Sequence, residues 1–534
     1  MAKSIKKVLI IDNGAYTIKA GFSSDSNPII IPNCVTKVKS ERRRPFIGDQ
    51  LEECKDYSGL YYILPFTKGY IINWDTQRQV WDYVFRVKLK LPTDNKNRFS
   101  EIGLIITEPL FNFKQIRENM IDFLFGEYGF GSILITNAPQ LAAFNYFYKQ
   151  NYTKHQNMQT NKRFKSMLST TNKEMACLVV DSGFSFTHIV PFIEGNKLLT
   201  HAKRINVGGK LLTNHLKEVI SYRQLNVLDE TYVVNQMKED CCFVSTNYWA
   251  DLEIASKKLS PINTINRYYV LPDYIMFKRG FIYDKTKHND IVNFEEHQRI
   301  RMNNERFQIP ELLFNPGDAL INQVGISHCI YDVVSQFNPK YTVDTTSNNI
   351  DNVVTSIRER PDNLKDIDSD EDESDVTENE DEEKLDNSND NDSKKNGINS
   401  ETKDDSAKQN GEDHHIENGL PTYQDLNIQS HLYNNILLIG GNCNFPNFQE
   451  RITNDIRTNV RDMLHVRVEK PSDPITYPWF GGQKICNVNE KGDCVGNISD
   501  SLYFKFAITR KEYDSKGLVY CNDKLANYQL PSFI

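Results

Sequence analysis

The fold of this chain is decided by two stretches, Ile11-Asp12-Asn13-Gly14-Ala15-Tyr16-Thr17-Ile18-Lys19 and Val180-Asp181-Ser182-Gly183-Phe184-Ser185-Phe186-Thr187-His188, which lie about 170 residues apart. In each, an apolar strand ends in Asp, a polar residue and a Gly allow a tight turn, and a second strand leads away. Such a turn points backbone N–H groups into a shared space, while the Asp is placed to hold a hydrated cation. A nucleotide phosphate tail requires these groups, so the pair predicts a nucleotide held between two related halves.

A third glycine turn, Ile439-Gly440-Gly441-Asn442, follows an apolar strand expected at residues 435–439. Two adjacent glycines let the backbone lie close against a flat ligand such as a purine. A Gly-Gly pair after a strand is also commonly a simple turn. Its position after the two phosphate turns favours the ligand interpretation.

The chain has 534 residues, more than one hydrophobic core usually spans, so two or more lobes are expected. Short β-branched runs, such as residues 103–107 and 177–180, alternate with amphipathic helical stretches. One helix is expected to begin at a cap formed by Asp75, and another follows Gly208-Gly209. This alternation predicts an α/β fold.

Composition argues against several classes of protein. No apolar run approaches the roughly 18 residues that a membrane helix needs. The apolar run after Lys6 and Lys7 is too short for a secretory signal. The ten cysteines are scattered, without the paired spacing of a zinc site. We therefore expect a reduced compartment, nucleus or cytoplasm, and no membrane partner.

The formal net charge of −8 is concentrated in one segment. Residues 362–413 hold 21 acidic and 6 basic residues, so the remainder of the chain is mildly basic, at +7. Residues 361–420 contain no Phe, Tyr or Trp and cannot bury enough apolar surface to offset the entropy lost on ordering. We expect a disordered, solvated spacer; the alternative is an acidic arm for histones or other basic proteins.

These features divide the chain into lobes and insertions. The predicted ranges are a first lobe at 1–147 with 34–66 as its small subdomain and 476–534 returning to it, a polar loop at 148–174, a second lobe at 175–345 with 208–300 as its outer subdomain, a disordered acidic insertion at 346–427, and completion of the second lobe at 428–475.

The residues resemble the superfamily of actin, the actin-related proteins, the heat-shock-seventy ATPases and the sugar kinases. The resemblance is to the actin branch, and it spans nearly the whole chain apart from the two insertions. It rests on segments in actin order: Lys68-Gly69-Tyr70-Ile71-Ile72-Asn73-Trp74-Asp75, Asn304-Glu305-Arg306-Phe307, Pro310-Glu311-Leu312-Leu313-Phe314-Asn315-Pro316, Gly440-Gly441-Asn442, Trp479-Phe480-Gly481-Gly482 and Ile508-Thr509-Arg510-Lys511-Glu512-Tyr513. It implies an actin-like ATPase-domain fold, in which two duplicated lobes with four subdomains surround a central nucleotide cleft.

Within that branch, three stretches look like the class-six actin-related proteins: residues 57–66, 184–191 and 206–218. Membership would imply a nuclear, structural subunit of a remodelling complex that deposits the Z-type variant of histone H-two-A. The implied partners are the remodelling ATPase subunit and a zinc-finger HIT-type subunit of that complex, with nucleosomes or histones met indirectly.

The resemblance also implies roles for residues of the cleft. Asp12 and Asp181 match the carboxylates that hold the water shell of Mg with ATP or ADP, and Lys19 matches a lysine that reaches the phosphates. Each aspartate could instead cap its turn, and Lys19 could be a solvated lysine at a strand end. The other implied nucleotide contacts are Asn13, Gly14, Ser182, Gly183, Gly209, Lys238, Glu239, Gly440 and Gly441.

Other positions depart from actin. Asn137 stands, one methylene shorter, where actin has the glutamine that orients the attacking water, and His188 is the one water-positioning residue kept. A misplacement of about 1 Å in phosphoryl transfer can cost on the order of a hundredfold in rate. We therefore expect no catalytic residue in working order: a pseudo-ATPase, or a very slow ATPase, that binds nucleotide.

Aromatic and apolar substitutions bear on binding itself. Ala15 removes a hydroxyl from the first turn, while Tyr16, Phe184, Ser185 and Ile475 replace small or polar residues. Binding is weakened if Tyr16 and Phe184 point into the cleft. If both turn outward, they are ordinary core residues.

Two rival functions come from other classes: an active ATPase or cytoskeletal filament protein, and a sugar kinase. The loop between Pro32 and Gly48, shorter than in actin, speaks against a homopolymer. Its basic run at residues 37–44 is either a solvated face or a contact for DNA phosphates or an acidic partner. Sequence-specific DNA binding is not expected, because no base-reading motif accompanies the run.

Overall fold

A computed structural model describes residues 5–38, 44–54, 59–91, 99–160, 176–257, 261–284, 286, 297–337, 423–489, 493–528 and 530, all within one unit of the chain. The predicted acidic insertion lies outside these ranges up to residue 422, as does most of the basic run at 37–44. None of the described helices is both long and apolar enough to span a membrane.

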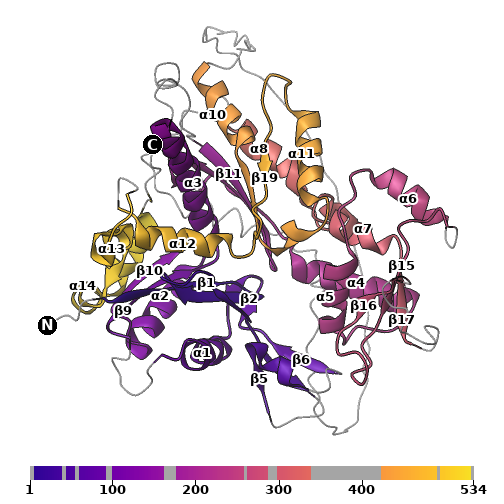
Figure 1. Cartoon of the computed structure of the whole chain (residues 1–534), viewed down its shortest axis with the longest axis horizontal. Helices are drawn as coiled ribbons and strands as arrows, with labels where there is room; N and C mark the ends of the chain where they lie inside the picture. Colours follow the sequence, from indigo (N-terminus) through magenta and orange to yellow (C-terminus); the bar gives the residue numbers. More distant parts are fainter. Residues whose placement is uncertain are drawn as a thin grey trace, which may run out of the picture. The chain divides into compact units, whose positions relative to one another are not determined.

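The first lobe is built on a six-stranded sheet in the order β20-β10-β9-β1-β2-β3 (Figure 1). Its strands are β1 (Lys7–Asn13), β2 (Thr17–Phe22), β3 (Ile29–Pro32), β9 (Ile102–Thr107), β10 (Ser132–Thr136) and β20 (Ile508–Thr509). The central strands β1, β9 and β10 are almost wholly buried, as expected for parallel strands covered on both faces. In the β1–β2 hairpin, Asp12 lies opposite Lys19.

Helices surround this sheet. They are α1 (Trp74–Tyr83), α2 (Lys114–Asp122), α3 (Ala138–Thr160), α12 (Tyr477–Asn487), α13 (Leu502–Phe506) and α14 (Arg510–Asn527). The side chain that caps α1 is Asn73, whose oxygen accepts a hydrogen bond from the N–H of Thr76. The expectation of an Asp75 cap was therefore wrong, because Asp75 already lies in the first helical turn.

Smaller strands extend the first lobe. They are β4 (Val35–Val38), β5 (Phe46–Ile47) and β6 (Leu60–Ile63), which form a sheet in the order β5-β4-β6, and the hairpin of β7 (Phe66–Thr67) and β8 (Tyr70–Ile71). The sheet packs a small core of its own around Phe46.

The second lobe repeats the plan of the first. Its sheet comprises β11 (Ala176–Ser182), β12 (Thr187–Ile193), β13 (Asn196–Lys197), β14 (Lys203–Ile205), β18 (Ile436–Ile439) and β19 (Val468–Glu469). β11 pairs antiparallel with β12 and parallel with β18, as β1 pairs antiparallel with β2 and parallel with β9. In the second hairpin Asp181 lies opposite His188. The two Asp-containing turns, at Asp12 and Asp181, thus occupy matching places in two matching sheets.

The remaining elements complete the second lobe. They are α4 (Gly209–Arg223), α5 (Thr231–Cys241), α6 (Tyr248–Ser256), α7 (Glu305–Glu311), α8 (Ile326–Ser335), α10 (Tyr423–Asn434) and α11 (Phe448–Asn459), with an outer sheet of β15 (Arg267–Val270), β16 (Phe281–Ile282) and β17 (Arg299–Met302).

Two boundaries differ from expectation. The loop expected from residue 148 gives way to helix α3, which continues to Thr160, because no Gly or Pro follows Pro139 to stop it. Residues 161–174 of that loop lie outside the described part. Helix α10 begins at Tyr423, inside the stretch expected to be disordered, where aromatic and apolar residues return.

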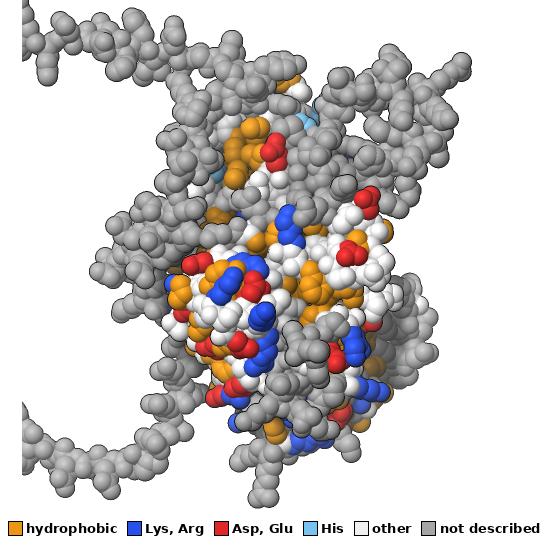
Figure 2. Space-filling view, turned by 90° about the vertical axis from the view of Figure 1, so that its left-hand side faces the viewer, with side chains coloured by type: hydrophobic (Ala, Val, Ile, Leu, Met, Phe, Trp, Pro, Cys, Tyr) orange, Lys and Arg blue, Asp and Glu red, His pale blue; other side chains and the backbone are white. Residues whose placement is uncertain are grey.

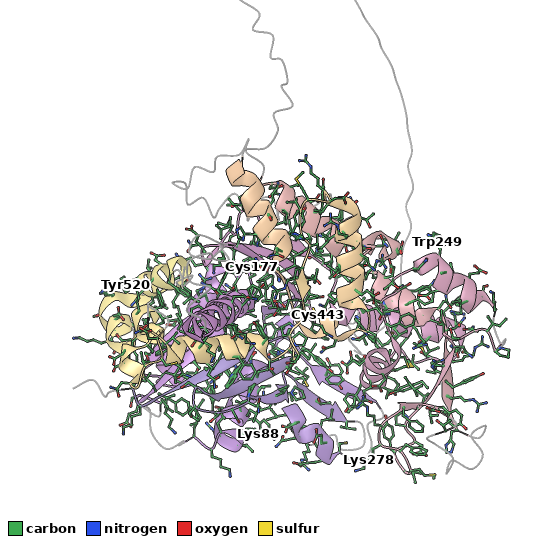
Figure 3. All side chains as sticks on the ribbon, turned by 45° about the horizontal axis from the view of Figure 1, so that its top comes forward. Lys88, Cys177, Trp249, Lys278, Cys443 and Tyr520 are labelled. Atoms are coloured by element: carbon green, nitrogen blue, oxygen red, sulfur yellow. The ribbon has the colours of Figure 1, made fainter. Side chains whose placement is uncertain are left out.

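Each lobe has its own large apolar core. Cys177 and Cys443 lie within the second lobe, whereas Trp249 and Tyr520 lie at opposite edges of the molecule (Figure 3). On the face shown in Figure 2, basic and acidic side chains are interspersed over the visible described surface. That face carries no field of a single sign where it is described.

A buried ion pair joins elements of the second lobe. Arg451 of α11 donates two hydrogen bonds to Glu311 of α7, at 2.9 and 3.0 Å. The same guanidinium binds Asp455 and the carbonyl of Ser245, and it lies over the ring of Phe314. The Glu311 side chain is only 4% exposed, so its charge depends on Arg451.

Candidate functional site

The three predicted turns line one cavity of about 500 Å³. Both lobes contribute to its walls. Of the residues implied by the resemblance, those that line it are Asp12, Asn13, Gly14, Lys19, Asp181, Gly183, His188, Gly209, Lys238, Glu239, Gly440 and Gly441. Ser182 and Asn137 do not.

The first turn carries an ion pair. Lys19 Nζ lies 3.1 Å from a carboxylate oxygen of Asp12, and both side chains are about one-tenth exposed or less. Lys19 is therefore not the solvated strand-end lysine of the alternative interpretation. The hydroxyl of Thr107 donates to the other oxygen of Asp12 and accepts from the N–H of Asn13, both at 2.8 Å. Thr107 fixes the turn, and its place at the end of β9 was not singled out in the sequence.

The side chain of Asn13 points into the protein rather than at the cavity. Its oxygen accepts from the indole N–H of Trp81, and its amide nitrogen lies 3.5 Å from the oxygen of Gln77. Gly14 is required beside it, because an added Cβ would lie 2.8 Å from the carbonyl of Thr17. The polar residue of this turn is thus structural, and its backbone is what faces a ligand.

The second turn carries its carboxylate without a cation opposite. Burial and the neighbouring charge of Asp12 raise the pKa of Asp181 to about 7, and Lys19 offsets part of this rise. Ser182 is fully buried, where it hydrogen-bonds with Thr187 and accepts from Asn442. It supports the turn from behind instead of contacting a ligand.

The third turn rests directly on the second. Gly440 has φ +94°, and an added Cβ would lie 2.2 Å from the carbonyl oxygen of Ser182. Asn442 completes the contact by donating to Ser182 and to the carbonyl of Gly183 at 2.8 Å. Gly441, by contrast, has open space where a side chain would stand. Asn442 was missed as a functional residue, since its partners are about 260 positions away.

Helix α5 supplies a polar wall. Lys238 donates to Asn235 at 2.8 Å, to Thr213 at 3.0 Å and to the carbonyl of Gly209 at 3.3 Å. Burial lowers the pKa of this lysine. Asn235 in turn donates to Glu239 at 2.8 Å. Lys238 therefore stabilises the wall through internal hydrogen bonds, and the carboxylate of Glu239 remains at the surface of the cavity.

Asn137 has a local task. Its side-chain oxygen accepts from the N–H of Gln140 at 3.1 Å at the start of α3, while its neighbours Ala138 and Pro139 face the cavity. His188 does line the cavity, and its Nε2 is buried with no hydrogen-bond partner in the described structure. Of the two residues expected near an attacking water, only His188 lines the cavity.

Tyr16 and Phe184 both turn inward. Their rings stack across the cavity, with centroids 5.0 Å apart and planes 23° apart. Asn235 donates a hydrogen bond to the Tyr16 hydroxyl at 3.0 Å. The alternative that both are outward-facing core residues is therefore wrong. Ile475 adds apolar surface to the cavity lining beside these two rings, and Ser185 lines the cavity as well.

His188 should make stability depend on pH. Burial and the charge of Arg204 lower its pKa to about 3, below the unfolded value of about 6.5. Between these values the unfolded chain binds the extra proton, so this group reduces the free energy of unfolding as pH falls. We expect the difference in free energy of unfolding between His188→Asn and the wild type to shift by about 2 kcal/mol in favour of the variant from pH 7 to pH 5, measured by urea unfolding in EDTA. Parallel pH curves for the two proteins would contradict this expectation.

Comparison with known proteins identifies the family. The family model described as Actin matches residues 4–356 and 387–526, which is most of the chain. The chain belongs to the actin family. A Drosophila melanogaster protein, "Actin-related protein 6", is 33% identical over 97% of this chain and 99% of its own length. The Dictyostelium discoideum protein of the same name is 28% identical over 97% and 94%.

A third relative, "Actin-like protein ARP6" of Cryptococcus neoformans, is 38% identical over 62% of this chain and 66% of its own length. Together these matches place the chain with the class-six actin-related proteins, as the sequence resemblance indicated. The actin-like α/β fold is confirmed with them.

Proposed function

We propose that this protein is a non-filamentous, nuclear subunit of a chromatin remodelling complex that deposits the Z-type variant of histone H-two-A. In this role the actin fold is a docking body for the remodelling ATPase and a zinc-finger HIT-type subunit. The proposal is supported by the class-six relatives and by a cleft that keeps its binding groups without a full set for water activation. Nucleosomes or histones would be met through the complex.

We further propose that the cleft binds adenine nucleotide, ATP or ADP with Mg, without significant hydrolysis, and that the inward-facing rings of Tyr16 and Phe184 weaken this binding. The residues present fit the ion: Asp12 and Asp181 face one cavity closely enough for the charge of Asp12 to raise the pKa of Asp181. A divalent cation there would supply charge neutralisation for phosphate groups. Lys19 would add a positive charge beside the first turn, and the glycines would allow close backbone approach.

The observation that carries the absence of turnover is the position of Asn137. Its side chain caps α3 and does not line the cavity, so it is not placed to hold a water in line for attack. His188 is neutral at neutral pH, since its pKa is lowered to about 3, and of these two residues it alone lines the cavity. The rival function, an active ATPase or filament protein, requires a positioned water that these two side chains do not supply together.

Steady-state turnover tests the proposal. We expect purified protein to release phosphate from ATP no faster than an Asp12→Ala variant, while a nucleotide-dependent rise in melting temperature is present in wild type and lost in the variant. The wild-type protein should also stay in the supernatant under actin-polymerising conditions. Turnover well above that of Asp12→Ala, or a sedimenting filament, would overturn the scaffold function. Purification from native cells without remodeller subunits would overturn the complex assignment.

A further inference from the structure

The centre of the cleft is crossed by a contact that the chain makes with itself. We propose that Tyr16 holds the two lobes closed in place of a ligand, so that the closed cleft persists in the nucleotide-free protein. The inference does not depend on whether nucleotide binds. It concerns a residue that neither the turn pattern nor the resemblance assigns to lobe closure.

Tyr16 belongs to the first lobe, and both of its partners belong to the second. Its ring stacks on Phe184 of the second turn, and its hydroxyl accepts from Asn235 of α5. Stacked aromatic pairs and buried hydrogen bonds each add stability beyond simple contact area. One side chain therefore joins the first turn to two separate elements across the cavity.

The partner of the Tyr16 hydroxyl, Asn235, is held in place by further hydrogen bonds. Asn235 accepts from Lys238 and Thr213 through its oxygen and donates to Glu239 through its nitrogen. A network in which every member is satisfied holds a fixed geometry. The Tyr16 hydroxyl is protonated at neutral pH, since a tyrosine ordinarily titrates near 10, and burial of its hydroxyl end and Glu239 raise its pKa further. The bond that closes the cleft is thus a neutral one and should resist salt.

A second contact between the lobes involves Gly69 and Phe186, which both line the cavity. The guanidinium of Arg204 lies 3.3 Å from the ring centroid of Phe186 and donates to the hydroxyl of Tyr70 at 2.7 Å. Phe186 also lies against Gly69 of the first lobe, so close that an added Cβ there would be 2.0 Å from the ring. This contact supports closure, but it is separate from Tyr16 and can be tested separately.

A third contact between the lobes lies outside the cavity lining. Tyr232 and Tyr274 of the second lobe pack on the small core around Phe46 of the first. Tyr16 is therefore one of several contacts between the lobes, and the one that crosses the cavity beside the first turn. Tyr16 itself remains 44% exposed, so its removal should loosen the cleft without leaving a cavity in either core.

Hydrogen–deuterium exchange of the full-length, nucleotide-free protein in EDTA tests the proposal. In Tyr16→Ala we expect about tenfold faster exchange in helix α5 and in the first turn, because the stack and the hydrogen bond are both lost. Tyr16→Phe, which keeps the ring, should give a smaller increase. The matched control is Tyr61→Ala, an exposed tyrosine of the same lobe, for which no change is expected.

Repeating Tyr16→Ala in a background that lacks both of its partners makes the test specific to the contact. In an Asn235→Ala, Phe184→Ala background, Tyr16→Ala should add nothing further to exchange in α5, since both of its partners are gone. Unchanged exchange in Tyr16→Ala, or an equal effect in Tyr61→Ala, would overturn the proposal. If Tyr16→Ala fails to fold, Tyr16→Phe is measured instead. Exchange in α5 as slow as in the wild type for Tyr16→Phe, together with small-angle scattering that shows separated lobes in the nucleotide-free wild type, would contradict closure by Tyr16.

Discussion

Gly69→Ala is expected to destabilise the protein by about 2–4 kcal/mol, because two penalties combine at this position. Gly69 has φ +76°, which a side chain rarely adopts, and its added Cβ would lie 2.0 Å from Phe186. Phe186 cannot simply retreat, since Arg204 lies over its ring at 3.3 Å. Urea or thermal unfolding measures the loss.

Gly517→Ala is a control for a positive φ without a packing clash. Gly517 has φ +77° and ψ 179°, and nothing in the described part of the chain lies within 4 Å of its added Cβ. It should lose only the strain of this glycine-type backbone conformation, about 1–3 kcal/mol. In a Phe186→Ala background, the loss caused by Gly69→Ala should fall, because only the backbone strain at Gly69 is left. An undiminished loss in that background would show that Phe186 does not pack against Gly69.

Arg451→Met should cost about 3–5 kcal/mol, because it leaves the buried carboxylate of Glu311 without its cationic partner, with only the amide of Asn315, among the described residues, still donating to it. Methionine keeps much of the apolar contact with Phe314, so the loss reports the charge and not the packing. The measurement is equilibrium unfolding at neutral pH. The addition of Glu311→Gln should recover part of the loss, since the orphaned charge is then removed.

Arg467→Met serves as the control for this pair. Arg467 binds Glu469 at 2.7 Å, but the two side chains are 49% and 36% exposed, so the expected cost is below about 1 kcal/mol. A loss in Arg451→Met as small as that in Arg467→Met would mean that water reaches Glu311.

The features that could be predicted from the sequence are those set by neighbouring residues. An apolar strand, an Asp and a Gly define each phosphate turn within nine positions, and both turns were placed correctly at one cavity. The Gly440-Gly441 pair was also recognised as a close approach of the backbone, but it was assigned to a flat ligand, whereas the structure shows that Gly440 packs against the carbonyl of Ser182, 2.2 Å from where a Cβ would stand. The resemblance to actin then supplied the family, which the family model confirms.

What escaped prediction depends on distant partners or on competing local bonds. The orientation of Tyr16 is fixed by Asn235, 219 positions away, and no periodicity reports that contact. Asn137 could be aligned with a water-positioning residue, but its oxygen is used by the N–H three residues ahead, as Asn commonly is at a helix start. The length of α3 was missed because polar composition was taken for a loop, although nothing in it breaks a helix.

The two hairpins share one backbone and differ across the ladder: Asp12 faces Lys19, whereas Asp181 faces His188. The two halves therefore share a backbone geometry but differ in the residue opposite the aspartate, so one half carries the cation of Lys19 and the other an imidazole kept neutral. Two aspartates that look interchangeable along the chain should tolerate substitution unequally. The fold is thus symmetric in its backbone, whereas the chemistry of the cavity depends on which side chain lies across from each aspartate on the neighbouring strand.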